Sequence, residues 1–413
     1  MDRAELARLL GPTCTVQENS AEIHVIEESN PKAFIKAFSH AIRGAGPLFL
    51  IDPNWGPSER KGLAGILASA ENRISDTSRG WLMIASGGTS GKLKFVRHDE
   101  QTLAVAVRGF CKHFEVKRVN WVGVLPMYHV SGFVAWCRTA ITGGTYLPWD
   151  WKEIEAGYLP KLNRAVDAAQ EGWYLSLVPT QLQRIFSSPH AETIIAWLRL
   201  FDGVFIGGGP IWPALATQAA ELKLPLCLSY GMTETAAMVT ALRPKEFLQG
   251  RRDSGCALPH ASICLNAQGL IEIDARSVFL GYYPEINLDQ HFVTEDLGEL
   301  DSEGNLTILG RHDAVIITGG KKVDPLEVEA VLRASGVFED VAVLGVTDLE
   351  WGQRIVALYP KPITELDQLK LDKHLLTLAS FKRPKQYIPI ENWPRNAQGK
   401  LNRAELGKRI ASA

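Results

Sequence analysis

The chain alternates short apolar runs of strand length with longer amphipathic stretches between Trp81 and Val239. The runs at 121–125, 174–178 and 204–206 are followed in turn by helix-like stretches at 133–142, 181–186 and 214–222. Strands that alternate with helices in this way are joined by crossover connections. The pattern therefore predicts an α/β fold whose core is a doubly wound, mostly parallel sheet.

The texture changes after this core. Residues 254–308 read as short alternating strands broken by Gly, Asn and Asp, which predicts an antiparallel β subdomain. Beyond Gly310 we expect a helix at 325–332 with Pro325 in its first turn, strands at 341–346 and 355–359, and a helix at 365–378. We therefore predict a large N-terminal domain, residues 1–310, and a small mobile C-terminal α+β domain, residues 311–413.

Charge and composition exclude several classes of protein. The 413 residues carry 44 Lys and Arg against 46 Asp and Glu, a net charge of −2, which gives no general attraction to nucleic acid or anionic membrane. No run approaches the roughly 18 apolar residues of a membrane helix, and the first residues lack a signal-peptide pattern. Six scattered cysteines without a C-x-x-C pair indicate buried reduced thiols and no zinc site. We expect a cytoplasmic enzyme without stable membrane insertion.

A loop rich in glycine and hydroxyl groups follows the predicted strand that ends at Ala85. Glycines let backbone N–H groups close on a polyphosphate, while hydroxyls add donors and a lysine adds charge. The residues that we assign to this role are Ser86, Gly87, Thr89, Ser90, Gly91 and Lys94. The loop is not a Walker A motif, because Ser86 stands where its first glycine belongs and Leu93 where it has Ser or Thr. A plain strand-to-strand turn is the alternative interpretation.

The loop resembles the phosphate loop of the adenylate-forming superfamily, which includes acyl-CoA synthetases, luciferases and non-ribosomal adenylation domains. The family loop usually ends in Pro-Lys, and here Leu93 replaces the proline. Further segments resemble the other motifs of the superfamily in the same order, so the resemblance runs from Ser86 to Arg403. It implies that ATP and a carboxylic acid form an acyl-adenylate with Mg²⁺, and that coenzyme A then receives the acyl group.

The resemblance also implies nucleotide contacts in the middle of the chain. Gly208 and Gly209 match the turn against which adenine lies, and Tyr230 with Gly231 matches the segment that stacks on it. Thr233 would touch the α-phosphate, and Glu234 would hold Mg²⁺, which prefers oxygen ligands. A simple turn for the glycines and a helix cap for Thr233 explain the same letters without a nucleotide.

Three later motifs complete the resemblance. Asp296 matches the aspartate that accepts both ribose hydroxyls, and Arg311 the arginine near ribose and phosphate; a surface turn would look similar. The junction at 311–313 would be the hinge, although Ala314 stands where many relatives have a second acidic residue. Gly319 and Gly320 match the pair that lines the pantetheine tunnel. Lys400 matches the catalytic lysine, whereas an isolated lysine is usually a solvated charge.

The sequence constrains the identity of the carboxylic acid substrate less strongly than it constrains the nucleotide contacts. Pro126 begins a motif whose His129 would border the acyl pocket, although a lone histidine is more often part of a core. Residues 175–184 look most like the o-succinylbenzoate–CoA ligases of menaquinone and phylloquinone synthesis, which are short members of the superfamily. Their substrate has a second carboxylate, and Arg184 is our candidate for a buried arginine that recognises it; an exposed helix arginine is the alternative.

Other activities remain open at this point. A ligase for another aryl or short acyl acid, a luciferase-like oxygenase and an adenylation-only enzyme share these motifs. Long-chain fatty acids are disfavoured by the short chain and the arginine. A P-loop kinase is disfavoured by the missing Walker pattern. Only 85 residues precede Ser86, which suggests a reduced N-terminal part.

Overall fold

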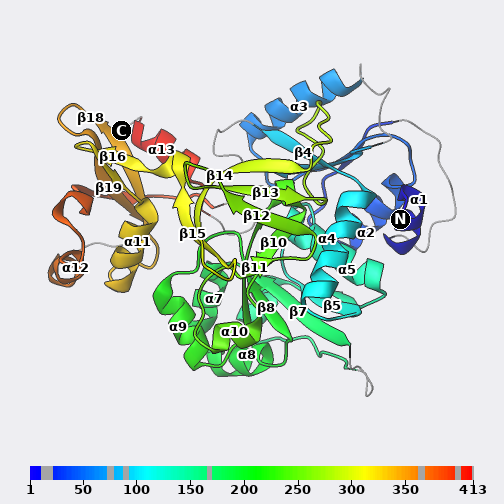
Figure 1. Ribbon diagram of the computed structural model, residues 1–413, viewed down its shortest axis with the longest axis horizontal. Helices are drawn as coiled ribbons and strands as arrows, with labels where there is room; N and C mark the ends of the chain where they lie inside the picture. The colour runs from blue at the N-terminus through cyan, green and yellow to red at the C-terminus, as the bar shows by residue number, and fades with distance from the viewer. Residues whose placement is uncertain are drawn as a thin grey trace.

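A computed structural model describes residues 1–10, 22–71, 79–86, 93–164, 170–360, 368–395 and 401–411. Within these ranges the chain folds into mixed and antiparallel sheets covered by helices (Figure 1). The predicted α/β class is confirmed.

The N-terminal part forms a four-stranded sheet in the order β1-β2-β3-β4. Strands β1 to β3 are parallel, and β4 runs antiparallel to β3, so that Ser86 pairs with Lys94 across the loop between them. The elements are β1 (His24–Ile26), β2 (Leu48–Leu50), β3 (Leu82–Ser86), β4 (Lys94–His98), α1 (Arg3–Leu10), α2 (Pro31–Ala41), α3 (Pro57–Glu71) and α4 (Glu100–His113).

The predicted parallel core is the seven-stranded sheet β11-β10-β9-β8-β7-β5-β6. Neighbouring strands from β5 to β9 are parallel, and β10 and β11 are antiparallel. Its strands are β5 (Arg118–Gly123), β6 (Tyr146–Pro148), β7 (Glu171–Leu177), β8 (Gly203–Ile206), β9 (Leu226–Met232), β10 (Ala237–Ala241) and β11 (Cys256–Ala257). The helices around it are α5 (Val130–Thr142), α6 (Trp151–Glu155), α7 (Pro179–Phe186), α8 (Ala191–Leu198), α9 (Pro213–Glu221) and α10 (Pro244–Leu248).

Both faces of this sheet are buried, because successive side chains of a strand point to opposite faces. Trp121 and Phe205 pack with Phe110 of α4 on one face. Their neighbours Val122 and Val204 belong to a second cluster, which includes residues of α7, α8 and α9. Burial on two sides explains why these strands are continuous apolar runs in the sequence.

The predicted antiparallel subdomain is present as the sheet β12-β13-β14-β15. It consists of β12 (Ala261–Leu265), β13 (Leu270–Ala275), β14 (His291–Leu300) and β15 (Leu306–Arg311). Strand β15 leads toward the C-terminal elements (Figure 1).

The last part of the chain forms its own sheet, in which β19 pairs with β16, β18 and β20. Its elements are β16 (Ile316–Thr318), β17 (Lys321–Val323), β18 (Ala342–Asp348), β19 (Gly352–Pro360), β20 (Gln386–Ile390), α11 (Pro325–Ala334), α12 (Gln368–Leu375) and α13 (Arg403–Ala411). The expected helix at 325–332 is thus confirmed and is two residues longer. Within the described residues α12 covers Gln368–Leu375, so it ends three residues before the expected end at 378.

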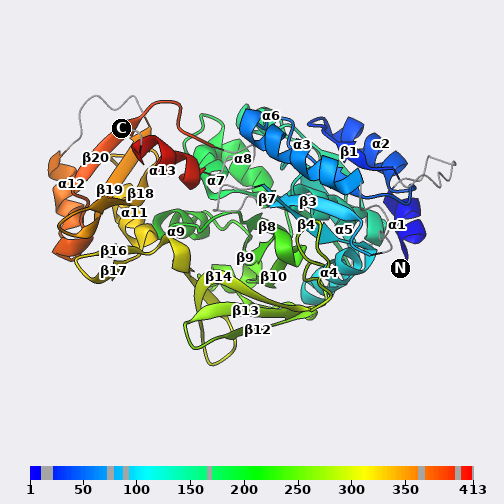
Figure 2. The same cartoon turned by 90° about the horizontal axis from the view of Figure 1, so that it is seen from above.

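Helix α11 lies beside α9 of the larger part (Figure 2). The Arg333 guanidinium of α11 lies 5.4 Å from the ring centroid of Trp212, the residue before α9. This contact joins the C-terminal sheet to a segment just after the Gly207–Gly209 turn.

Two smaller expectations can be compared with the structure. Of the cysteines in the described ranges, Cys137 and Cys227 are buried, but Cys256 and Cys264 are exposed, so the expectation of buried thiols is wrong for these two. The exposed pair lies on β11 and β12, short strands at the edges of their sheets. Among the described residues, no helix is long and apolar enough to cross a membrane.

Candidate active site

The predicted nucleotide motifs meet at one edge of the seven-stranded sheet. The 207–209 turn follows β8, Tyr230 lies near the end of β9, and His129 begins α5 after β5. Because β5, β7, β8 and β9 are parallel, their carboxyl ends share this edge. Ligands of open α/β sheets bind outside this edge. We call the part around Glu234, Tyr230, Asp296 and Arg311 the nucleotide side, and the part around His129 and Arg184 the acid side.

Glu234 is a nearly buried carboxylate on the nucleotide side. It lies in a one-turn 3₁₀ helix, Thr233–Thr235, between β9 and β10, and is 7% exposed. Its Oε1 accepts hydrogen bonds from the Ser86 hydroxyl and the Tyr282 hydroxyl, both at 2.9 Å. Lys94 lies with its Nζ 4.9 Å from the centroid of the Tyr282 ring. A carboxylate, two hydroxyls and an ammonium group thus meet although they come from three distant segments.

The main chain of Thr233 is hydrogen-bonded to His98, the last residue of β4. The His98 Nε2 donates to the Thr233 carbonyl at 2.7 Å, and its Nδ1 lies 3.1 Å from the Thr102 hydroxyl. Burial lowers the pKa of His98 to about 4, so the ring is neutral at pH 7. A neutral ring that donates from Nε2 accepts at Nδ1, which suits a hydroxyl partner.

Tyr230, Asp296 and Arg311 form the second cluster on this side. The Tyr230 hydroxyl donates to Asp296 Oδ2 at 2.7 Å, and Arg311 Nη1 lies 3.5 Å from Asp296 Oδ1. Antiparallel pairing of β14 with β15 places Asp296 directly opposite Arg311. Burial and the charge of Asp296 raise the pKa of Tyr230 far above its usual value, so its hydroxyl stays a donor.

Arg311 also reaches the proposed hinge. Its Nε and Nη2 each donate to one carboxylate oxygen of Asp313 at 2.7 Å. The paired hydrogen bonds raise the pKa of Arg311 further above its usual value. Arg311 thus contacts both Asp296, the candidate for ribose binding, and Asp313 in the proposed hinge.

The candidate glycines have different structural reasons. Gly208 has φ +78°, a conformation that favours glycine, and nothing lies within 4 Å of the position of a side chain at Gly209. Gly231 is required by packing, because a Cβ there would come 2.0 Å from the Ala237 carbonyl oxygen. Gly319 and Gly320, with φ +54° and +75°, form the two-residue turn between β16 and β17.

His129 lies on the acid side at the start of α5. Its Nε2 is buried and 3.8 Å from Asp52 Oδ2. Burial lowers the pKa of His129 to about 4, and the nearby carboxylate offsets only part of this effect. A neutral, enclosed ring fits a pocket wall better than a base that must gain a proton near pH 7.

Arg184 is not buried, so this part of the prediction is wrong. Its side chain is 54% exposed in the last turn of α7, and Nη1 lies 3.5 Å from Glu155 Oε1 of α6. The buried residues of α7 are Pro179, Leu182 and Ile185, which repeat every three positions along one face. Arg184 lies off this face. Its role toward the acid stays a prediction.

Several candidates fall outside the described residues. These are Gly87, Thr89, Ser90 and Gly91 of the phosphate loop, and Lys400. Their roles stay predictions.

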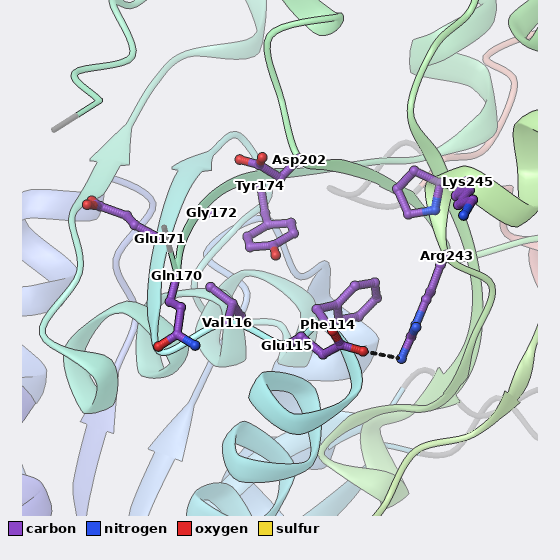
Figure 3. A pocket seen from close by; sticks show the side chains of 11 residues that line it. Phe114, Glu115, Val116, Gln170, Glu171, Gly172, Tyr174, Asp202, Arg243 and Lys245 are labelled. Atoms are coloured by element: carbon purple, nitrogen blue, oxygen red, sulfur yellow. Dashed lines mark ion pairs between the residues drawn. The ribbon is translucent and has the colours of Figure 1, made fainter. Parts of the chain in front are cut away.

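A cavity of about 390 Å³ lies at the other edge of the seven-stranded sheet, lined by the starts of β7 and α10 (Figure 3). Glu115 and Arg243 face one another there at 3.5 Å. No candidate site residue lines this cavity. It is therefore separate from the site assembled by the motifs.

Comparison with known proteins decides the family. The model of the family described as AMP-binding enzyme matches residues 20–283, about two thirds of the chain. The chain belongs to this family. It is an adenylate-forming acid–CoA ligase by its relatives: it is 30% identical over 348 residues to 2-succinylbenzoate–CoA ligase of Listeria innocua, covering 81% of this chain and 71% of the relative.

A second relative and two solved structures cover nearly the whole chain. Probable 2-succinylbenzoate–CoA ligase of Mycobacterium tuberculosis is 28% identical over 404 residues, which are 94% of this chain and 98% of the relative. The o-succinylbenzoate CoA synthetase of Bacillus subtilis in complex with its acyl-adenylate has a TM-score of 0.76 at 20% identity, over 98% and 91% of the chains. Its complex with ATP and Mg²⁺ has a TM-score of 0.73 at 20% identity, over 97% and 92%. These structures share the fold of this chain.

Glu234 fits the Mg²⁺ that the family implies. The Ser86 and Tyr282 hydroxyls both donate to Oε1, and within the described chain Oε2 accepts no hydrogen bond. The described residues contain no group of three or more His, Cys, Asp or Glu side chains that could hold a metal ion by themselves. One carboxylate that acts together with substrate phosphates is the usual way in which proteins bind Mg²⁺.

Two residues of the site were missed by sequence reasoning. Tyr282 is 48 positions from Glu234 in the chain, and His98 is 135 positions from Thr233. No spacing rule connects residues so far apart. Both follow only from the strand pairing that brings β4 beside the 3₁₀ turn.

Proposed function

We propose that this ligase activates o-succinylbenzoate and forms o-succinylbenzoyl-CoA, as in menaquinone or phylloquinone synthesis. The observation that carries the proposal is the similarity of nearly the whole chain to ligases named for this acid. The nucleotide motifs that come together at one edge of the seven-stranded sheet support the ATP-dependent chemistry. Residues 175–184, which include Arg184, support the choice of acid.

In the first half-reaction, one carboxylate oxygen of the acid attacks the α-phosphorus of ATP, and pyrophosphate leaves. Mg²⁺ supplies charge stabilisation to the phosphates when it is bound. Glu234 would hold the metal, and the Ser86 hydroxyl, at the start of the phosphate loop, donates to that carboxylate. Thr233, Lys94 and the loop residues Gly87, Thr89, Ser90 and Gly91 would donate to the phosphates. We place Lys400 at the transferring phosphate, where negative charge accumulates.

The nucleoside is bound by the second cluster. Asp296 accepts the ribose hydroxyls, because two carboxylate oxygens match a vicinal diol. Arg311 orients Asp296, and the adenine lies between Tyr230 with Gly231 and the open turn at Gly208 and Gly209. The hydrogen bond from the Tyr230 hydroxyl to Asp296 keeps the carboxylate in place before the nucleotide binds.

In the second half-reaction, the CoA thiolate attacks the acyl carbon and AMP leaves. Residues 1–310 and 311–413 act as two domains that rotate about 311–313, which removes Lys400 and brings Gly319 and Gly320 to the thiol path. Two observations support this division of the chain into two domains: the C-terminal strands form a separate sheet, and the Arg311–Asp313 ion pair lies just before its first strand.

Pyrophosphate release with a panel of acids tests the proposal. We expect release with o-succinylbenzoate, and formation of its thioester when CoA is added. Activity on benzoate or a short acyl acid, with none on o-succinylbenzoate, would reject the acid and leave the ligase assignment in place. Pyrophosphate release without thioester formation would indicate an adenylation-only enzyme.

A further inference from the structure

Tyr282 lies in a segment whose position is fixed by its main chain. The Phe279 N–H donates to the Glu234 carbonyl at 2.8 Å, the Leu280 N–H to the Arg97 carbonyl at 2.9 Å, and the Tyr283 N–H to the Phe95 carbonyl at 2.8 Å. Residue 282 itself bridges Val96 of β4. The backbone therefore places residue 282 between the phosphate-loop strand and the 3₁₀ turn whatever its side chain is.

The Tyr282 side chain makes two different contacts from this place. Its hydroxyl donates to Glu234 Oε1, and its ring receives the Lys94 ammonium group at 4.9 Å. A phenol hydroxyl is protonated at neutral pH, so Tyr282 is the donor of this hydrogen bond and the carboxylate accepts it. The ring contact is a cation–π interaction, which does not consume a carboxylate.

These contacts keep two opposite charges apart. Lys94 and Glu234 both touch Tyr282, yet these two described residues form no ion pair within 4.0 Å. A direct ion pair would occupy the carboxylate that must bind a cation and the ammonium that must bind a phosphate. An aromatic ring with a hydroxyl at its edge can hold both groups and leave each charge available.

We propose that Tyr282 is a positioning residue of this site, an inference that rests on the proposed ATP-dependent function. Its hydroxyl fixes the Glu234 carboxylate through Oε1, and Oε2, which accepts no hydrogen bond from the described residues, would then be available to a cation. Its ring holds Lys94 of the phosphate loop away from that carboxylate. We assign Tyr282 no contact with the carboxylate oxygen of the acid or with the α-phosphorus of ATP.

Two substitutions separate the hydroxyl from the ring. Tyr282→Phe removes only the hydrogen bond, so we expect the Mg²⁺ concentration for half-maximal pyrophosphate release to rise on the order of tenfold. The KM for the acid should not change. Tyr282→Leu also removes the ring, and we expect a further rise of about two- to fivefold in the KM for ATP.

Tyr283→Phe is the matched control. The Tyr283 ring packs on Phe49 at 5.3 Å between centroids, outside the Glu234 cluster, so its Mg²⁺ requirement should equal that of the unmodified enzyme. Melting temperature and circular dichroism of all three variants test for misfolding. An unchanged Mg²⁺ requirement in folded Tyr282→Phe would overturn the inference, as would equal changes in the constants for Mg²⁺ and for the acid.

Calorimetry of ATP binding, with and without Mg²⁺, separates this inference from the proposed function. If the unmodified protein releases no pyrophosphate with any acid, the proposed function fails. The inference still requires that Mg²⁺ strengthen ATP binding in the unmodified protein and do so less in Tyr282→Phe. ATP binding that does not depend on Mg²⁺ would overturn both.

Discussion

On the nucleotide side, the Glu234 and Asp296 carboxylates each accept hydrogen bonds from other segments of the chain. On the acid side, the buried Nε2 of His129 has no hydrogen bond from the described residues, and Arg184 is half exposed and paired with Glu155. The first set is organised before any ligand binds. The second set has polar groups that are still available to a substrate. We therefore expect the nucleotide side to serve the chemistry common to all acids, and the acid side to select one acid.

The largest effect that we predict concerns Lys400, the residue that we propose to act on the transferring phosphate. Lys400→Ala should slow adenylate formation on the order of 10²- to 10³-fold, because a charge at the transferring phosphate is lost. Thioester formation from pre-made acyl-adenylate should stay nearly unchanged, since that step needs the other domain orientation. The two half-reactions must be assayed separately. Equal losses in both would reject the division of roles.

The second prediction concerns the metal ligand. Glu234→Gln keeps the size and an acceptor oxygen for Ser86 and Tyr282, but removes the charge that attracts Mg²⁺. We expect a loss of roughly 10²-fold in kcat/KM for Mg·ATP. Binding of the acid alone, measured by calorimetry, should be the same in both proteins. A variant with an unaltered magnesium requirement would remove Glu234 from this role.

The difference between the two sides also explains how far sequence can predict this molecule. Apolar runs followed by amphipathic stretches identify β5, β7 and β8 with their helices, because burial on both faces leaves a continuous apolar pattern. The residues of the nucleotide side lie in short motifs with unusual letters, such as the Tyr-Gly before Thr233. The resemblance of these motifs to those of the adenylate-forming superfamily selects them, because local chemistry alone is equally compatible with turns and a helix cap.

Contacts between distant segments could not be predicted in this way. The antiparallel register that sets Asp296 opposite Arg311 includes an irregularity between Leu297 and Gly298, which no sequence rule supplies. The hydrogen bond from Tyr282 to Glu234 depends on that kind of pairing as well. The exposure of Arg184, in contrast, can be predicted from the sequence, because Pro179, Leu182 and Ile185 define the buried face of α7 and Arg184 is not on it.

A third prediction compares stability on the two sides. Burial lowers the pKa of His98 and of His129 to about 4, against about 6.5 in an unfolded chain. The unfolded state therefore binds more protons between these values, so the free energy of unfolding falls as the pH drops from 6.5 toward 4. For fully buried His98 the loss is on the order of 3 kcal/mol.

Urea unfolding at pH 7.0, 5.5 and 4.5 measures this slope. His98→Gln keeps a donor for the Thr233 carbonyl but does not titrate, so its stability should depend less on pH than that of the unmodified protein. His190→Gln, at an exposed position, is the control and should leave the slope unchanged. A His98→Gln protein with the full slope would show that other groups cause the acid sensitivity.

The smallest predicted effect tests the acid side. If Arg184 recognises the second carboxylate of o-succinylbenzoate, the substrate must compete with Glu155 for the guanidinium group. Exposed ion pairs contribute about 0–1 kcal/mol, so Arg184→Ala should raise the KM for this acid only about threefold to fivefold. A monocarboxylate such as benzoate should show no change.

Glu155→Gln sharpens the same test, because it removes the competitor and leaves Arg184 in place. We expect this variant to lower the KM for o-succinylbenzoate by about twofold to fourfold, and to do so less at high salt, where exposed charges are screened. The double variant should behave like Arg184→Ala alone, since Glu155 can act on the acid only through that arginine. Independent, additive effects of the two substitutions would mean that Arg184 does not contact the acid. Recognition of the second carboxylate would then have to come from another residue on the acid side.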